Sequence, residues 1–310
     1  NAHLPALLAL QERVKIVAVY SRTYAAATAL AQRIEDGVSI YTDLPALLAR
    51  ADIDAVDLLL PIPIQAEFVE AALRAGKHVI SEKPIAPDST TAQRLIALHA
   101  DRPAQVWMVG ENWRYEEAFE RAAYLIAANA IGRPVTAAWS RFAALKPGNP
   151  YYATTWRRSG FAGGLLLDGV IHLAAALRLV LGEVAGVVSM VEQVAPDLPP
   201  ADTLAAVLRF ASGATCSLQV SYAVDSPWGA PLTIIGTAGS LRVDRGFVEL
   251  ARPGVAVERI ECGKLHGVQR ELLAFADAIQ HGAPHRNTPA EGLRDLAVIE
   301  TLLAARTPGL

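Results

Sequence analysis

Apolar and polar positions follow two alternating patterns through the first third of the chain. Short β-branched runs are each followed by a helical pattern, in the order RVKIVAVYS, AAATALAQRIE, VSIY, LPALLARA, AVDLLLP, QAEFVEAALRAG, HVISEKP, TTAQRLIALHA and QVWMVG. Strand and helix at this spacing are typical of right-handed βαβ units, which build a doubly wound parallel sheet. We therefore predict an α/β domain with a parallel sheet over residues 1–115.

From about residue 134 the pattern changes to strands joined by turns. The predicted strands are PVTAAWSRFAAL, TLAAVLRFA, ATCSLQVSYAV, PLTIIGT, SLRVD, FVELAR and VAVERIE. Such a series indicates a mainly antiparallel sheet. One helix is predicted at 165–181, and helical periodicity returns in VQRELLAFADAIQHG and PAEGLRDLAVIETLLAA. We predict an α+β domain over residues 116–310.

The first residues form a helical pattern, with apolar positions at Leu4, Leu7 and Leu8, and no glycine-rich loop precedes it. In a doubly wound nucleotide-binding sheet the first strand is central, and its neighbours need it as a backbone partner. We therefore expect further residues upstream that supply this strand and the phosphate-binding loop.

The composition favours an enzyme of small molecules. The net charge of -3 gives no basic surface for nucleic acid and no polybasic membrane patch. The most apolar stretch contains Asp168, His172 and Arg178, so it does not fit a membrane span. Cys216 and Cys262 are too few and too far apart for a zinc pair or a disulfide scaffold. With no recognisable signal peptide, we expect a cytoplasmic protein.

Lys83 is the first candidate for chemistry, because it follows the strand predicted at 79–81. Open α/β sheets bind their ligands at the carboxyl ends of the strands. Pro84 keeps Lys83 out of helical geometry, and a Lys-Pro bond can also be cis. The alternative is a solvated lysine in a turn, the ordinary place for this residue.

Asp168 and His172 lie four residues apart, so on a helix they share one face. A neutral imidazole can take a proton from an alcohol, and a nearby carboxylate can orient it. The alternative makes Asp168 a helix N-cap and His172 a half-buried residue with a structural partner. No convincing further ligands accompany the pair, so we expect no metal.

Ser21 and Arg22 end the first predicted strand, where a dinucleotide fold normally holds an acid on the adenosine ribose. An arginine there suits a 2′-phosphate, which favours NADP over NAD. The alternative is a surface arginine at the start of a helix.

Two further segments offer hydrogen-bond donors and flat rings that suit a hydroxylated ligand. They contribute Asn112, Arg114 and Tyr115, and then Trp156 and Arg157. Aromatic residues near a domain boundary are also common packing residues, and this alternative stays open.

Together these segments resemble the Gfo/Idh/MocA oxidoreductases, the family of glucose-fructose oxidoreductase and inositol dehydrogenase. AGKHVISEKP is similar to the family's A-G-K-H-V-x-x-E-K-P, and GGLLLDGVIHLAAALRLVLGE resembles its G-G-x-L-x-D-x-G-x-H helix. AIGRPVTAAWSRF and ELLAFADAIQHG resemble the opening of its second domain and its late helix. The resemblance implies a Rossmann domain, an open-faced sheet that makes homodimer or homotetramer contacts, and a site between the two domains.

The resemblance also implies roles for individual residues. Lys83 would contact the reacting oxygen, and Asp168 and His172 would form the acid/base pair. Cofactor contacts would come from Ser21, Arg22, Pro61, Glu82, Lys83, Pro84, Asn112, Trp156 and Arg157, and substrate contacts from Lys83, Arg114, Tyr115, Arg157, Asp168 and His172. The sequence departs from relatives at Ala175, often an aspartate, and at residues 60–63, where many relatives have Thr-Pro.

The implied activity is NAD(P)-dependent hydride transfer to or from a secondary alcohol of a sugar, cyclitol or related polyol. Two alternatives stay open. One is redox-assisted cleavage of a glycoside on the same scaffold. The other is a non-catalytic regulator that senses nucleotide or sugar, although the presence of Lys83, Asp168 and His172 together argues against it.

Overall fold

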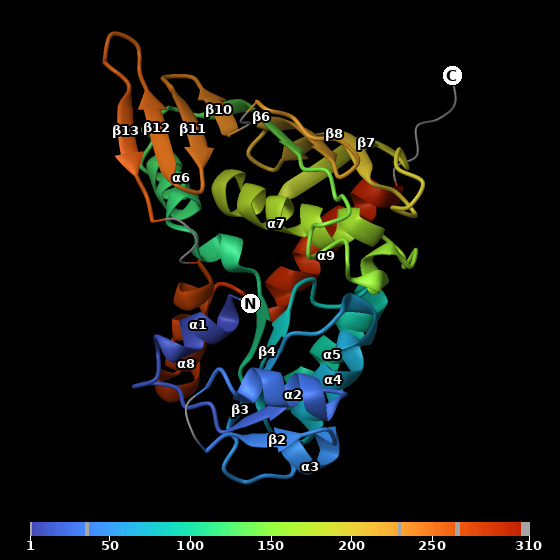
Figure 1. The fold of residues 1–310 in the computed structure, drawn as a ribbon. Helices are drawn as coiled ribbons and strands as arrows, with labels where there is room; N and C mark the ends of the chain where they lie inside the picture. Colours follow the sequence, from blue (N-terminus) through green and yellow to red (C-terminus); the bar gives the residue numbers. More distant parts are fainter. Residues whose placement is uncertain (1, 35–36, 229–230, 264–266, 305–310) are drawn as a thin grey trace.

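The computed structural model describes residues 2–34, 37–228, 231–263 and 267–304. Figure 1 shows two stacked lobes, a lower one from the first third of the chain and an upper one built on a large sheet. Near the end of the chain, α8 (Gly267–His281) lies beside the first helix in the lower lobe, and α9 (Pro289–Ala304) runs from there into the upper lobe (Figure 1). The two predicted fold classes are therefore confirmed.

The lower lobe holds parallel strands in two hydrogen-bonded groups. Strand β1 pairs with β2, and β3, β4 and β5 pair in that order. Among the described residues no strand hydrogen-bonds to both groups. The strands are Ala18–Tyr20, Ser39–Tyr41, Ala55–Leu58, His78–Glu82 and Trp107–Gly110, and the helices α1 to α5 are His3–Leu8, Tyr24–Ala31, Leu44–Leu48, Ile62–Arg74 and Ser89–Ala100.

Local sequence explains where these helices begin and end. The side chain of Thr23 accepts a hydrogen bond from Ala26 N at 3.3 Å and caps α2, and Asp88 accepts one from Thr91 N at 2.7 Å and caps α5. Gly76, with φ +80°, follows α4 in the left-handed conformation that glycine tolerates. Helix α2 ends at Ala31, earlier than the predicted 35. Residue 35 itself lies outside the described residues.

The upper lobe is an eight-stranded sheet in the order β13-β12-β11-β10-β6-β9-β8-β7. All neighbours are antiparallel except β6 and β9, which run parallel. The strands β6 to β13 are Pro134–Phe142, Val184–Glu192, Thr203–Phe210, Thr215–Ser221, Leu232–Gly236, Ser240–Asp244, Phe247–Ala251 and Glu258–Glu261. Helices α6 (Glu117–Ala127), α7 (Gly164–Leu181) and α9 (Pro289–Ala304) pack on one face of this sheet.

Helix α7 is the central core helix of the upper lobe. It is long and apolar enough to cross a membrane, but 78% of that stretch is buried inside the fold. It packs against α6, α9 and strand β8, and its Leu166, Leu173 and Leu177 are fully buried. Its apolar surface is therefore covered by protein.

Helix α8 (Gly267–His281) returns to the lower lobe, where it packs on α1, β5 and the 3₁₀ helix η1 (Asn112–Tyr115). The chain thus crosses between the lobes more than once. The division of domains at residue 115 stays a prediction. For the site, the important consequence is that α7 lies over the carboxyl end of β5, because it packs directly on η1.

Candidate active site

Lys83 follows directly after β4 and reaches into the upper lobe. Its Nζ donates to the carboxylate of Asp168 at 2.7 Å and to the backbone carbonyl of the same residue at 2.6 Å. Only 13% of its side chain is exposed, so the alternative of a solvated lysine is wrong. Burial lowers the pKa of Lys83, but the charges of Asp168 and Glu82 outweigh burial and hold it above its usual value. Lys83 is therefore a buried ammonium.

The turn that carries Lys83 is held by a residue that the sequence analysis missed. Gln65, fully buried on α4, donates from Nε2 to the carbonyl of Glu82 at 2.7 Å and to that of Pro84 at 2.8 Å. The Glu82 carboxylate accepts from the backbone N–H of Lys83 at 3.1 Å, and the Lys83-Pro84 bond is cis. Both carbonyls of this buried turn therefore have a donor.

Asp168 lies inside α7, whose N-cap is Gly163, so the alternative of a helix cap is wrong. One carboxylate oxygen accepts from Lys83, and the other accepts from Arg157 Nε at 2.7 Å. Burial alone would raise the pKa of Asp168, but the two cations hold it well below its usual range. Asp168 is thus an ionised carboxylate between two cations.

His172 has a different partner from the one predicted. Its Nδ1 lies 2.8 Å from the Glu111 carboxylate. The two carboxylate oxygens of Asp168 are taken by other partners, one by Lys83 and the other by Arg157. The idea that Asp168 orients His172 is therefore corrected: the two share a helix face, but Glu111 orients the ring. Burial raises the pKa of Glu111, yet His172 and two further cations lower it below its usual value. An ionised Glu111 favours the proton on Nδ1 and leaves the lone pair on Nε2.

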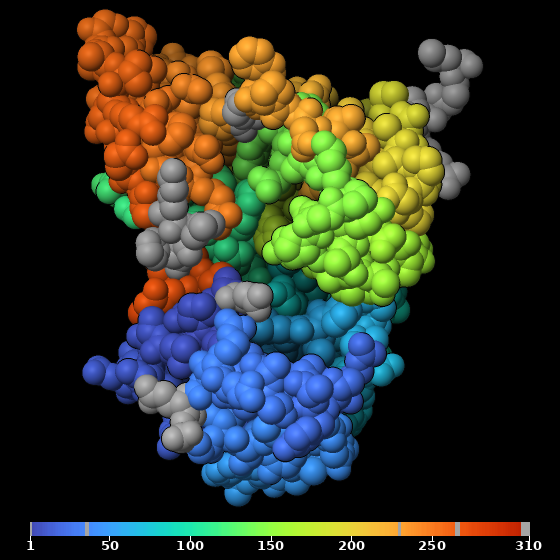
Figure 2. All heavy atoms as spheres, viewed as in Figure 1, coloured from blue at the N-terminus to red at the C-terminus, as the bar shows by residue number. Residues whose placement is uncertain are grey.

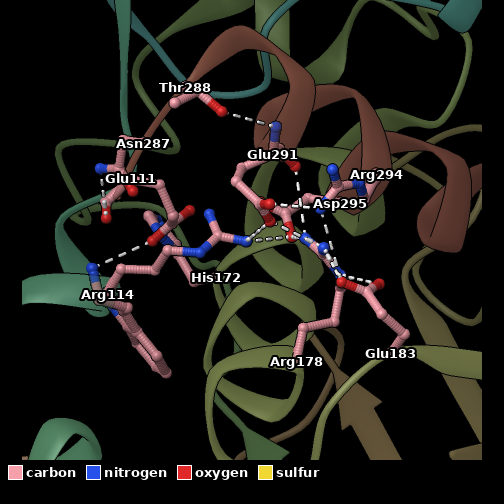
Figure 3. Close-up of polar contacts among 11 residues, drawn as sticks. Glu111, Arg114, His172, Arg178, Glu183, Asn287, Thr288, Glu291, Arg294 and Asp295 are labelled. Atoms are coloured by element: carbon pink, nitrogen blue, oxygen red, sulfur yellow. Dashed lines mark hydrogen bonds and ion pairs between the residues drawn. The ribbon is translucent and has the colours of Figure 1, made fainter. Parts of the chain in front are cut away.

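Trp113 and Asn287 complete the surroundings of this pair. The Trp113 ring stacks on the His172 imidazole with centroids 5.3 Å apart and planes 15° apart. Asn287 donates to the Glu111 carbonyl at 3.0 Å (Figure 3). Glu111 could have been found from sequence, because it follows β5 directly at the edge where parallel sheets bind ligands. Trp113 gives no such signal.

Arg114 and Tyr115 lie elsewhere than predicted. Arg114 is buried and donates to Asp295 on α9 at 2.6 Å, and Arg178 on α7 shares that carboxylate (Figure 3). The Tyr115 hydroxyl, also buried, accepts from Arg286 N at 3.1 Å. Both side chains serve the packing between lobes, so their assignment as substrate contacts is corrected.

Of the other predicted residues, Arg157 contacts Asp168 directly, Trp156 lies beside Arg157, and Asn112 lies further away. Arg157 is held on two sides. Its guanidinium carbon lies 4.2 Å from the Trp156 ring centroid, and Nη1 donates to Thr154 Oγ1 at 2.9 Å. Trp156 therefore supports Arg157 by stacking. Asn112, half-buried in η1, donates to Glu116 at 3.3 Å and makes no described bond to Lys83, Asp168 or His172.

Three predicted cofactor contacts lie at strand ends of the lower lobe. Pro61 precedes α4 after β3, at the same edge as Lys83, because β3 and β4 are parallel. Ser21 and Arg22 follow β1, whose last residue, Tyr20, contacts Phe68 on α4 with ring centroids 6.0 Å apart. Arg22 is exposed, and within the described part of the chain it has no ion pair. A free cation at a strand end fits the phosphate of a dinucleotide.

No group of three or more His, Cys, Asp or Glu side chains in the described ranges could hold a metal ion. The buried charges at the site pair with one another. Lys83 and Arg157 flank one carboxylate, and His172 faces the other, Glu111.

An ammonium, a guanidinium and an oriented imidazole at the carboxyl ends of parallel strands are suited to proton and hydride chemistry on an alcohol. Residues 1–110 match the model of an oxidoreductase family with an NAD-binding Rossmann fold, and residues 119–242 match the GFO/IDH/MocA C-terminal domain. The chain belongs to the Gfo/Idh/MocA oxidoreductase family. It is an oxidoreductase with an NAD-binding fold.

Individual family members agree with this assignment over nearly the whole chain. Dehydrogenase FPY6 of Fusarium mangiferae is 34% identical over 98% of this chain and 92% of its own length. The dTDP-3,4-didehydro-2,6-dideoxy-alpha-D-glucose 3-reductase of Actinomadura kijaniata is 28% identical over 96% and 90%. The crystal structure of an oxidoreductase from Thermotoga maritima has a TM-score of 0.91 and 32% identity, over 98% and 91%.

The depressed pKa of Asp168 predicts how stability depends on pH. Because the folded carboxyl holds its proton less tightly than the ordinary value of 3.8, its contribution to stability is complete above that pH. It is lost as the pH falls through the folded pKa, since the unfolded chain is protonated first. In Asp168→Asn, the free energy of unfolding should be lower at pH 7 and fall less steeply below pH 4 than in the wild type.

Urea denaturation of both proteins between pH 2 and 7 would measure this difference. Asp101→Asn is the matched control, because this exposed helix-end carboxylate has no described ion pair. Parallel pH curves for wild type and Asp168→Asn would contradict the prediction.

Proposed function

We propose that this oxidoreductase transfers a hydride between NADP and a secondary alcohol of a sugar, cyclitol or related polyol. The observation that supports this best is the ion pair between Lys83, directly after β4, and Asp168 on α7, with His172 one helical turn further along α7. The relative from Actinomadura kijaniata, named as a reductase of a dTDP-linked sugar, is consistent with this substrate class.

In this mechanism the substrate hydroxyl lies between Lys83 and the free Nε2 of His172. The imidazole accepts the hydroxyl proton, and Glu111 stabilises the imidazolium that forms. The Lys83 ammonium donates to the oxygen as negative charge develops on it. Bound NADP supplies the hydride acceptor. Reduction of a ketone runs through the same groups in reverse.

Asp168 holds Lys83 in place. With one oxygen on Lys83 and the other on Arg157, it aims the ammonium and keeps it charged. Arg157 is in turn fixed by stacking on Trp156. Asp168 therefore acts as a positioning residue, and His172 alone serves as the acid/base.

For the cofactor, we assign the strand-end residues to the dinucleotide. Arg22 and Ser21 would bind the 2′-phosphate of NADP, Pro61 would line the nicotinamide side, and Lys83 would lie next to the reacting ring. The exposed, unpaired state of Arg22 among the described residues supports NADP over NAD. Glu82, Pro84 and Asn112 would contact the cofactor through the backbone of the segments that contain them.

We also propose that the protein is a homodimer or a homotetramer in the cytoplasm. On the open face of the upper sheet, Val188 is 74% exposed, Met190 61% and Val207 50%. Val188 and Val207 are directly paired across β7 and β8, so the apolar surface is continuous. Both cysteines are free, as expected in a reducing compartment.

Lys83→Met should lower kcat with NADP about 100-fold or more while the protein stays folded, because the charge on the reacting oxygen loses its stabilising ammonium. Absorbance of NADPH at saturating polyol would measure it, with Lys15→Met, an exposed lysine without a described partner, as the control. A variant with wild-type turnover would remove Lys83 from the mechanism. Substrate cleavage without net NADPH formation would instead favour the glycoside-cleaving alternative.

Arg22→Ala should lower the ratio of kcat/KM for NADP over that for NAD about tenfold or more, since a charge-assisted bond to the 2′-phosphate is lost. Steady-state kinetics with both cofactors would measure the ratio. Arg33→Ala, a nearby exposed arginine without a described ion pair, should leave it unchanged. An unchanged ratio in Arg22→Ala would mean that another residue selects the cofactor.

Val188→Asp should shift the protein from oligomer to monomer, because a buried, unpaired carboxylate at the interface is costly. Sedimentation velocity at micromolar concentration would detect the shift. Val224→Asp is the control, because Val224 is also exposed but lies in the loop after β9, outside the paired strands. If Val188→Asp sediments like the wild type, the contact lies elsewhere.

A further inference from the structure

A recess opens beside His172, at one end of the large sheet. Its wall includes Trp113, which also stacks on the His172 ring. Figure 2 shows the recess between the orange strands near residue 245 and the green segment that follows β6. The lining residues are Trp113, Phe119, Trp139, Ser140, Arg141, Phe142, Ala143, Trp228, Val243, Asp244 and Arg245.

Arg141 is carried into this recess by the register of the sheet. Along β6, Ala137 and Trp139 are buried on the face that the helices cover, and Arg141 is the next residue on that face. Because β6 and β9 are parallel and Arg141 is paired with Val220, Tyr222 on the same face comes two residues later. The side chains of Arg141 and Tyr222 therefore lie at neighbouring strand ends, on the face of the sheet that α7 covers.

The guanidinium of Arg141 contacts the Trp113 ring, and no carboxylate in the described ranges forms an ion pair with it. Its central carbon lies 5.7 Å from the centroid of the Trp113 ring, and none of the described carboxylates or carbonyls bonds to it. Arg245 lies over the same ring at 5.3 Å, but Glu116 neutralises it. The one carboxylate in the lining, Asp244, accepts from the backbone N–H of Arg245 at 2.7 Å.

Tyr222 connects Arg141 with the reacting centre. Its ring packs on α7 at Gly169, where a Cβ would lie 1.6 Å from the phenol oxygen. The hydroxyl therefore lies on the helix backbone next to Asp168. Burial raises the pKa of Tyr222 to about 12, so the phenol keeps its proton and can donate it to an acceptor.

We propose that Arg141 and Tyr222 form a subsite for an anionic group on the substrate, a carboxylate or a phosphate on the same molecule as the reacting alcohol. This inference rests on the proposed function and narrows its substrate class to sugar acids and sugar phosphates. The Arg141 guanidinium binds the anion through two parallel N–H hydrogen bonds. The Tyr222 hydroxyl donates a hydrogen bond to a substrate oxygen between the anionic group and the reacting carbon.

Two physical points support an anion over a neutral group. A guanidinium held near an indole ring by a cation–π contact has lost part of its rotamer freedom already, so binding costs less further entropy. Its planar donors match two acceptor oxygens on one atom, which a neutral hydroxyl does not offer. The recess is open to solvent, so the anion reaches Arg141 without the cost of full burial.

The test compares matched acidic and neutral compounds: D-gluconate with D-glucitol, D-galacturonate with D-galactose, and D-glucose 6-phosphate with D-glucose. The wild-type protein is assayed for NADP and NAD reduction, and binding is measured by calorimetry with the cofactor present. We expect at least one acidic compound to bind about tenfold or more tightly than its neutral counterpart, with the same preference in kcat/KM.

Arg141→Met keeps an unbranched side chain of similar reach and removes its charge. It should lower the acidic-to-neutral ratio about tenfold or more, mainly through KM, and Arg141→Lys should restore part of it. Tyr222→Phe should weaken binding of the acidic compound by a smaller factor. Arg209→Met, an exposed arginine on β8 without a described ion pair, should leave the ratio unchanged.

The outcomes separate this inference from the function on which it rests. Turnover of neutral compounds with no preference for acidic ones, or an unchanged ratio in Arg141→Met, overturns the anionic subsite and leaves the dehydrogenase intact. Tighter calorimetric binding of an acid that depends on Arg141, without reduction of either cofactor, supports the subsite and counts against the dehydrogenase. Neither binding nor turnover in any pair overturns both.

Discussion

The ion pair between Lys83 and Asp168 is the contact on which the site depends. It joins a strand end of the lower lobe to a core helix of the upper lobe, and both side chains are largely buried. Removing charges from water is costly, so each residue stabilises the other in this buried position. Arg157 supplies the second cation, and the Asp168 carboxylate therefore stays ionised. The same pairing keeps Lys83 charged and holds its ammonium at the carboxyl end of β4.

A second buried network fixes the lobes that this ion pair spans. Arg114 next to β5 and Arg178 on α7 both bind Asp295 on α9, and Glu291 also accepts from Arg178 (Figure 3). Helix α9 contacts α5, β5, α7 and β7, so it packs on both lobes. A mutation that leaves one of these charges unpaired would cost more than the pair contributes. We infer that this network preserves the geometry between Lys83 and His172.

In the proposed function, the reacting centre would carry out the chemistry and the recess would select the substrate. Lys83, Asp168 and His172 lie in segments that resemble the family's motifs, and in the proposed function they would account for chemistry common to many alcohols. Arg141 and Tyr222 come from the ends of β6 and β9, and they would choose among those alcohols. Such a division lets one fold accept new substrates, because sheet ends and loops vary without disturbing the buried ion pairs.

Sequence by itself determined the two fold classes, the strand that delivers Lys83 and the helix that carries Asp168 and His172. These depend on local periodicity and on residues close together in the chain. Only the tertiary structure decided which charged residues form ion pairs with each other. Glu111, 61 residues before His172, takes the place expected for Asp168, and Arg114 pairs 181 residues away. Spacing along the chain cannot reveal such partners, because a buried charge takes whichever opposite charge the packing of helices brings within reach.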